Sequence, residues 1–216
     1  MERITIDIVS DVVCPWCYLG KADLDRALEA NPEHPFIIEW HPFQLAPQMP
    51  RGGVERAAYL LRIFGTQDRA VAAHLRLAEL GREAGLEFNF EAIKTTPNTF
   101  DAHRLIHWAG LEGRQSAVVS ALFRAYWREG RDIGHHDVLV DIAGKSGLDR
   151  QVIARLLASD ADAQTVAARE LHAREKGISA VPTYIVADTH VISGAQQPAL
   201  WGRVIDELLN RNEGQE

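Results

Sequence analysis

Hydrophobic and polar positions at the start of the chain first alternate and then take a helical spacing. Residues 3–9 place β-branched side chains on one face and polar side chains on the other, which predicts a strand. Apolar residues recur three or four positions apart over 19–30, which predicts a helix, and 36–40 predicts a second strand. We therefore expect a strand–helix–strand unit in the first 45 residues.

From residue 46 to residue 176 the pattern becomes helical, in stretches rich in Ala, Leu and Arg. Glycines between these stretches are typical helix stop signals. The segment 86–96 has no helical period, so we expect an extended loop there. The predicted helices are 54–64, 67–84, 98–112, 115–129, 135–146, 149–158 and 161–176.

The last 40 residues return to strand patterns. Residues 183–186 and 190–192 are rich in β-branched side chains, and Asp188-Thr189 between them predicts a tight hairpin. Pro198 then opens a closing helix, since proline is well tolerated in the first helical turn.

The order of these elements predicts a small α/β sheet that is interrupted by a helical block. Both ends of the chain supply strands, while the middle supplies helices alone. We therefore expect a discontinuous α/β domain over 1–45 and 177–216, with an inserted helical domain over 46–176.

Composition and charge exclude several classes of protein. The chain has 216 residues, of which 46% are hydrophobic and 25% charged, as in ordinary globular proteins. The net charge of −7 and the absence of a dense basic run argue against a nucleic-acid partner. No apolar stretch approaches the ~20 residues of a membrane span, and acids stand where a signal peptide would be apolar. We expect a cytoplasmic protein with no membrane partner.

The two cysteines, Cys14 and Cys17, carry the chemistry. They stand three positions apart after the first predicted strand, where a helix begins, and Pro15 suits the first helical turn. A helix N-terminus favours a thiolate, so we expect Cys14 to be the exposed nucleophile and Cys17 the shielded resolving thiol. The other interpretation is a pair of core cysteines or half of a metal site. A cytosolic Cys-x-x-Cys beside a strand–helix–strand pattern favours the redox interpretation.

Val181-Pro182-Thr183 precedes the first strand of the predicted hairpin. A thioredoxin fold places a cis-proline at this junction, where the backbone before it can pair with an extended substrate. We therefore expect a cis Val181–Pro182 bond beside Cys14, although an ordinary strand-start proline is the alternative.

Several motifs together resemble the FrnE-type branch of the DsbA-like thioredoxin superfamily, over essentially the whole chain. Cys-Pro-Trp-Cys by itself is shared with many redox proteins, whereas the Asn-Thr…His-Arg and Ser-Gly-Ala-Gln blocks are more specific. The motifs are Asp11-Val12-Val13-Cys14-Pro15-Trp16-Cys17, Trp40-His41-Pro42-Phe43-Gln44-Leu45, Pro97-Asn98-Thr99-Phe100-Asp101-Ala102-His103-Arg104, Val181-Pro182-Thr183 and Ile192-Ser193-Gly194-Ala195-Gln196.

This resemblance implies a thioredoxin-like fold with a large inserted all-helical domain, and thiol–disulfide oxidoreductase activity. It further implies that Asn98, Thr99 and His103 face the cleft opposite the dithiol. We also expect Trp16 to be an exposed aromatic contact for substrate, which binds beside Val181 and Pro182. Some members of the branch carry a second, C-terminal cysteine pair, which this chain does not have.

Related families leave a second function open. Kappa-class glutathione transferases and 2-hydroxychromene-2-carboxylate isomerases share the implied architecture but typically carry serine at the position of Cys14. The alternative is therefore a glutathione-linked isomerase or transferase that acts on a chromene or polyketide-like small molecule. We expect no tightly bound cofactor, glutathione as a redox partner, and thiols or disulfides of proteins or small molecules as substrates. The sequence leaves a homodimer and the direction of redox work open.

Two further sets of residues have competing interpretations. Asp11 could relay a proton to or from Cys17, or could simply cap the end of the strand. His103 and His107 have a zinc-binding spacing, but the glutamate of the metalloprotease motif is absent and no third ligand is evident. We therefore interpret the two histidines as part of a helix face and expect no metal.

Overall fold

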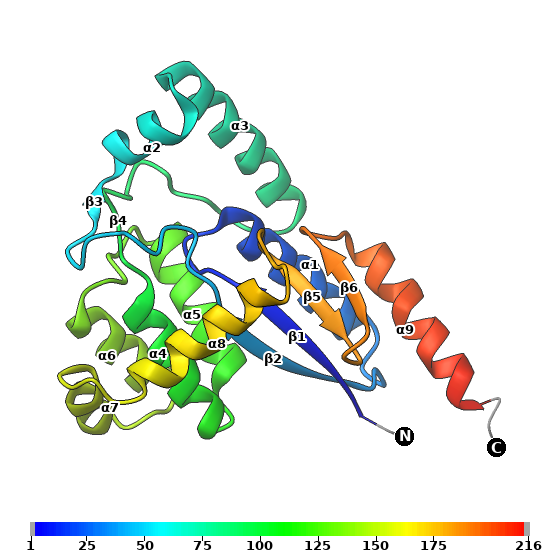
Figure 1. The fold of residues 1–216 in the computed structure, drawn as a ribbon. Helices are drawn as coiled ribbons and strands as arrows, with labels where there is room; N and C mark the ends of the chain where they lie inside the picture. Colours follow the sequence, from blue (N-terminus) through cyan, green and yellow to red (C-terminus); the bar gives the residue numbers. More distant parts are fainter. Residues whose placement is uncertain (1–2, 214–216) are drawn as a thin grey trace.

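The computed structural model describes residues 3–213 as a thioredoxin-like α/β fold with a helical insertion (Figure 1). A four-stranded sheet in the order β2-β1-β5-β6 forms its centre. The strands are β1 (Ile4–Ser10), β2 (Phe36–Pro42), β5 (Thr183–Val186) and β6 (His190–Ser193). β1 pairs parallel with β2 and antiparallel with β5, so the two ends of the chain meet in one sheet.

One face of the sheet packs against α1 (Pro15–Ala30) and α9 (Pro198–Glu213). Ile6 and Ile8 alternate with polar positions in β1 and are almost completely buried, as the strand pattern predicts. Tyr184 of β5 stands on the same face, where its ring packs edge-on against Trp201 of α9 at 4.8 Å. This face is the core of the thioredoxin-like part.

The predicted helices of the middle segment are all present in the structure, with ends that differ by at most two residues. The elements of this segment are β3 (Val54–Glu55), α2 (Arg56–Phe64), α3 (Gln67–Glu83), β4 (Thr95–Thr96), α4 (Phe100–Leu111), α5 (Gln115–Trp127), α6 (His136–Lys145), α7 (Arg150–Leu157) and α8 (Ala163–Glu175).

One part of the middle segment differs from the prediction. Val54 pairs with Thr96 and Glu55 with Thr95, so a short two-stranded sheet takes the first residues of one predicted helix and the end of the predicted loop. Two-residue strands carry no measurable period, so only their pairing partner reveals them.

The insertion has a buried helical core and a helical pair that stands out from it. Apolar side chains of α4 and α5, such as Leu105, Leu122 and Phe123, are fully buried against the sheet and α6. α2 and α3 project away from this core, as Figure 1 shows at the top of the molecule. No helix in the described range is long and apolar enough to cross a membrane.

Candidate functional site

The dithiol lies where β1 ends and α1 begins. Cys14 is the N-cap of α1 in an extended conformation, Pro15 follows in the first turn, and the Cys14 amide donates to the Asp11 carbonyl at 3.0 Å. Both cysteines are free thiols, and Cys14 is 3% exposed and Cys17 1% exposed. Cys17 is thus the deeper of the two, as expected. The expectation of an exposed Cys14 is wrong, because a neighbouring backbone segment covers it.

That segment carries Val181 and Pro182. The Val181–Pro182 peptide bond is cis, and the Cys14 sulfur lies 3.6 Å from the Val181 carbonyl oxygen, to which its thiol donates. The Pro182 carbonyl accepts from the Gly194 amide at 2.8 Å, which ties the segment to the end of the hairpin. The structure therefore brings Cys14 beside Val181 and Pro182, although Cys14 and Val181 are 167 residues apart in the sequence.

The environment of Cys17 keeps its thiol protonated. Burial raises the pKa of Cys17 well above its usual value, and the neighbouring Cys14 raises it further. The Ser10 hydroxyl and the Asp11 backbone amide act in the opposite direction, because both can donate to a thiolate. Cys17 therefore needs a proton acceptor before it can act as a nucleophile.

A buried carboxylate and imidazole lie beneath the turn that holds Cys14. Asp11 is 1% exposed and His103 of α4 is 4% exposed. The Asp11 Oδ2 accepts from the Leu45 amide at 2.8 Å, whereas Oδ1 faces the His103 Nε2 at 3.5 Å. Neither of these last two atoms has a hydrogen-bond partner. One oxygen of Asp11 thus holds the loop after β2, and the other accepts no hydrogen bond from the described residues.

Aromatic residues of α5 connect the insertion to the dithiol turn. The Trp127 indole Nε1 donates to the Val12 carbonyl at 3.2 Å, two residues before Cys14. The guanidinium of Arg56 lies over the Trp127 ring, 5.5 Å from its centroid. Sequence reasoning missed Arg56, although it is a lone cation at a helical position in phase with the apolar Leu60 and Ile63.

Asn98 supports neighbouring backbone, whereas Trp16 is exposed as expected. The Asn98 amide donates to the Met49 carbonyl at 2.6 Å, and its oxygen accepts from the Phe100 amide at 2.9 Å. These bonds make Asn98 a support for a loop and for the start of α4, and its contact with substrate stays a prediction. Trp16 is 45% exposed and lines a cavity of 280 Å³ between α1, the end of α3 and the start of α9.

The histidine pair of α4 does not converge on one position. His103 faces Asp11, whereas the His107 Nδ1 accepts from the Arg169 guanidinium at 3.4 Å. Burial lowers the pKa of His107, and the charge of Arg169 lowers it further. The two side chains therefore have different partners despite their zinc-like spacing.

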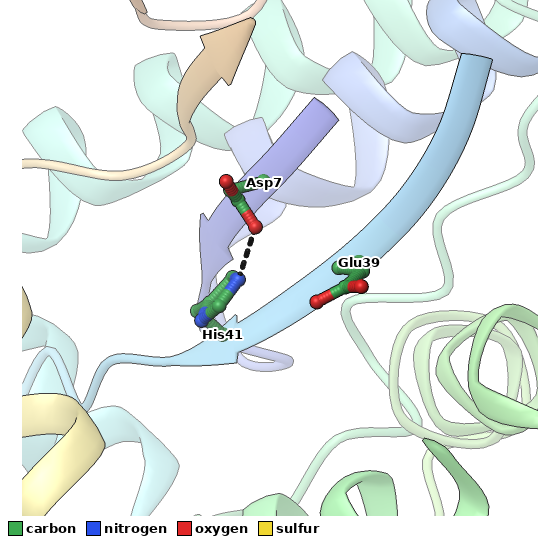
Figure 2. Close-up of side chains that lie close together, drawn as sticks. All are labelled: Asp7, Glu39 and His41. Atoms are coloured by element: carbon green, nitrogen blue, oxygen red, sulfur yellow. Dashed lines mark hydrogen bonds and ion pairs between the residues drawn. The ribbon is translucent and has the colours of Figure 1, made fainter. Parts of the chain in front are cut away.

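Another group of possible metal ligands lies on the face of β1 and β2 that is opposite to Ile6 and Ile8. Asp7, Glu39 and His41 bring ligand atoms within 4.8 Å of one another, and Figure 2 shows Asp7 and His41 pointing toward each other. The His41 Nε2 lies 2.6 Å from the Asp7 Oδ1, and its Nδ1 lies 3.2 Å from the Arg169 Nη2. Because a guanidinium can only donate, Nδ1 accepts and Nε2 carries the proton toward Asp7. These residues thus fit a hydrogen-bond network better than a metal site.

Comparisons with known proteins agree with this geometry. The chain is 27% identical over 206 residues to the uncharacterized protein YwbO of Bacillus subtilis, covering 94% of this chain and 96% of that protein. Its fold is similar to that of a probable DsbA oxidoreductase from Streptomyces coelicolor, with a TM-score of 0.86 and 28% identity over 96% of this chain and 91% of the other.

A third similarity concerns the fold alone. The structure of a 2-hydroxychromene-2-carboxylate isomerase matches with a TM-score of 0.75 and 17% identity, over 98% of this chain and 99% of that one. The model of the DSBA-like thioredoxin domain family matches residues 5–205, which include both cysteines, the cis-proline segment and the whole helical insertion. The chain therefore belongs to the DSBA-like thioredoxin domain family.

Proposed function

We propose that this protein is a thiol–disulfide oxidoreductase, with Cys14 as the nucleophile and Cys17 as the resolving thiol. The observation that carries the proposal is the placement of Cys14 at the N-terminus of α1, with its sulfur 3.6 Å from the Val181 carbonyl. The backbone at Val181 can pair with an extended substrate and bring the sulfur of that substrate to Cys14.

The reaction has two exchange steps. The Cys14 thiolate attacks one sulfur of a substrate disulfide, so a mixed disulfide forms and the other substrate sulfur leaves with the electron pair of the broken bond. Cys17 then loses its proton and attacks the Cys14 sulfur, which releases the second substrate thiol and forms the Cys14–Cys17 disulfide. The substrate disulfide gains two electrons and the protein dithiol loses them. A thiol reductant such as glutathione restores the dithiol, and the same steps in reverse oxidise a substrate.

The Asp11–His103 pair is the proposed acceptor for the Cys17 proton. Burial opposes ionisation of the Cys17 thiol, and the Asp11 backbone amide can donate a hydrogen bond to the same sulfur. The free oxygen of Asp11 and the His103 imidazole can hold the proton between them while Cys17 attacks. We favour this role over strand capping, since the capping bond to Leu45 uses only one of the two oxygens.

The surroundings of the reaction are also proposals. The expected substrates are thiols or disulfides of proteins or small molecules, with glutathione as a redox partner and no tightly bound cofactor. The cytoplasm is the proposed location, since a dithiol is kept reduced there.

The second candidate is a glutathione-linked isomerase or transferase that acts on a chromene or polyketide-like molecule. The observation that favours it is the fold similarity to the 2-hydroxychromene-2-carboxylate isomerase over nearly the whole chain. Such a reaction uses only the position of Cys14, whereas disulfide exchange needs Cys17 as well.

Insulin reduction and refolding of scrambled ribonuclease, with wild type, Cys17→Ser and Cys14→Ser, separate the two functions. We expect wild type to be active, Cys17→Ser to accumulate mixed disulfides, and Cys14→Ser to accumulate almost none. If Cys17→Ser keeps full turnover of a chromene-type substrate with glutathione while wild type fails to reduce insulin, the isomerase function replaces the oxidoreductase function.

A further inference from the structure

A buried arginine at the start of α2 has no acidic partner among the described residues. Arg56 is 9% exposed, and its Nη1 donates to the Thr96 hydroxyl at 3.3 Å and to the Tyr126 hydroxyl at 3.2 Å. The Trp127 ring forms a third contact, 5.5 Å from the guanidinium carbon. All three partners are neutral, and burial raises the pKa of Tyr126 to about 12, so its hydroxyl stays protonated at neutral pH.

The lack of a counter-charge distinguishes Arg56 from the other buried arginine of the insertion. Arg104 pairs with Asp101 at 2.7 Å and donates to backbone carbonyls at the end of α7 and in the segment that follows it. Within residues 3–213, no carboxylate lies within 4.0 Å of the Arg56 guanidinium. Burying a guanidinium without an anion is costly, so a protein that retains one has a use for its charge.

Two of the donor groups of Arg56 remain available to a ligand. A guanidinium offers five N–H donors, and in this structure the protein engages only Nη1. Arg56 keeps a small exposed area, and no described residue forms a hydrogen bond with its Nε or Nη2. A planar pair of donors is the geometry that binds a carboxylate through two parallel hydrogen bonds.

The Trp127 ring connects Arg56 to the turn that carries Cys14. Trp127, beneath the guanidinium, holds the Val12 carbonyl two residues before Cys14. Tyr59 lies three residues after Arg56 on α2 and is half-buried. Burial raises the pKa of Tyr59, the charge of Arg56 lowers it, and the charges of Asp11 and Cys14 raise it. Tyr59, one helical turn after Arg56, is therefore within electrostatic range of Cys14.

We infer that Arg56 is an anion-binding residue at the mouth of the dithiol, and that the preferred substrates are thiols or disulfides that carry a carboxylate. This inference rests on the proposed oxidoreductase function and narrows its substrate class. The substrate carboxylate supplies the counter-charge that the protein does not, while the adjacent disulfide sulfur meets Cys14. Small acidic disulfides and acidic peptide segments share this chemistry.

Three small disulfides of different charge test the inference on the wild-type protein. They are 3,3′-dithiodipropionate (anionic), bis(2-hydroxyethyl) disulfide (neutral) and cystamine (cationic). The rate constant for oxidation of the reduced dithiol is divided by the rate constant of the same disulfide with dithiothreitol, which removes differences in intrinsic reactivity. We expect the corrected rate to be roughly tenfold or more higher for the anionic disulfide than for the neutral one, as a charge-assisted hydrogen bond allows.

Variants then assign the preference to one residue. Arg56→Gln should remove the preference for the anionic disulfide, whereas Arg69→Gln should keep it, since Arg69 is an exposed arginine of α3 with the same charge. Equal corrected rates for the three disulfides in wild type, or an unchanged preference in a folded Arg56→Gln variant, would overturn the inference. If Arg56→Gln does not fold, the wild-type series still decides. Failure of all three disulfides to oxidise the dithiol would instead refute the proposed function.

Discussion

The contact between α1 and the cis-proline segment allows a quantitative test of how the site is held together. Gly20 is buried in the middle of α1, and a Cβ there would meet the Tyr184 hydroxyl, together with the Ala195 Cα and the Pro182 Cγ at 3.3 Å each. The Tyr184 ring is 1% exposed and packed on Trp201, so it cannot swing away. Gly20→Ala should therefore overpack the contact of α1 with Tyr184 and Pro182.

The free energy of this change has two parts. Alanine gains up to about 1 kcal/mol over glycine inside a helix, whereas overpacking a close-packed core costs about 1–3 kcal/mol. We expect a net loss of about 1–2 kcal/mol in the free energy of unfolding. Tyr184→Phe by itself should be nearly neutral or slightly stabilising, because the hydroxyl is buried without a hydrogen-bond partner.

Urea denaturation of both single variants and the double variant measures the coupling. In the Tyr184→Phe background the cost of Gly20→Ala should fall by about 1 kcal/mol, because the nearest obstacle is gone. Gly202→Ala in α9 is the matched control: nothing lies within 4 Å of its Cβ position, so it should stabilise by up to about 1 kcal/mol. Equal costs of Gly20→Ala in both backgrounds would refute the packing argument.

Three further predictions concern the dithiol and its supports. In Cys14→Ser, the thiolate absorbance of Cys17 at 240 nm should appear only at a pH well above the usual cysteine pKa, because burial is the largest cause of the raised pKa of Cys17. Ionisation of Cys17 at the usual pKa would contradict this. Asp11→Asn should slow release of the Cys14 mixed disulfide by roughly tenfold or more in stopped-flow assays, with Cys14 alkylation unchanged. Equal slowing of both steps would indicate a structural role. Asn98→Ala should cost about 1–3 kcal/mol in urea denaturation, since it loses bonds to Met49 and to the start of α4.

Local periodicity accounts for most of the predicted fold. The alternation in β1 and the three-to-four spacing in α1 follow from contacts between near neighbours, so they are readable in the sequence. The pairing of β3 with β4 depends on residues 40 positions apart, which no window of the sequence can show. For the same reason the burial of Cys14 was not predicted, because the Val181 carbonyl that covers its sulfur comes from the other end of the chain.

The sequence by itself determined the helices, the four strands of the central sheet and the two sulfurs that stand at the start of α1. Only the tertiary structure decided how those sulfurs are surrounded. It places His103 of α4 against Asp11, and it leaves Arg56 buried among neutral partners near the dithiol. The physical reason is that a side chain's ionisation and access depend on burial and on charges from elements far apart in the chain. Apolar periodicity reports only which face of an element is buried, not which charged group it meets there.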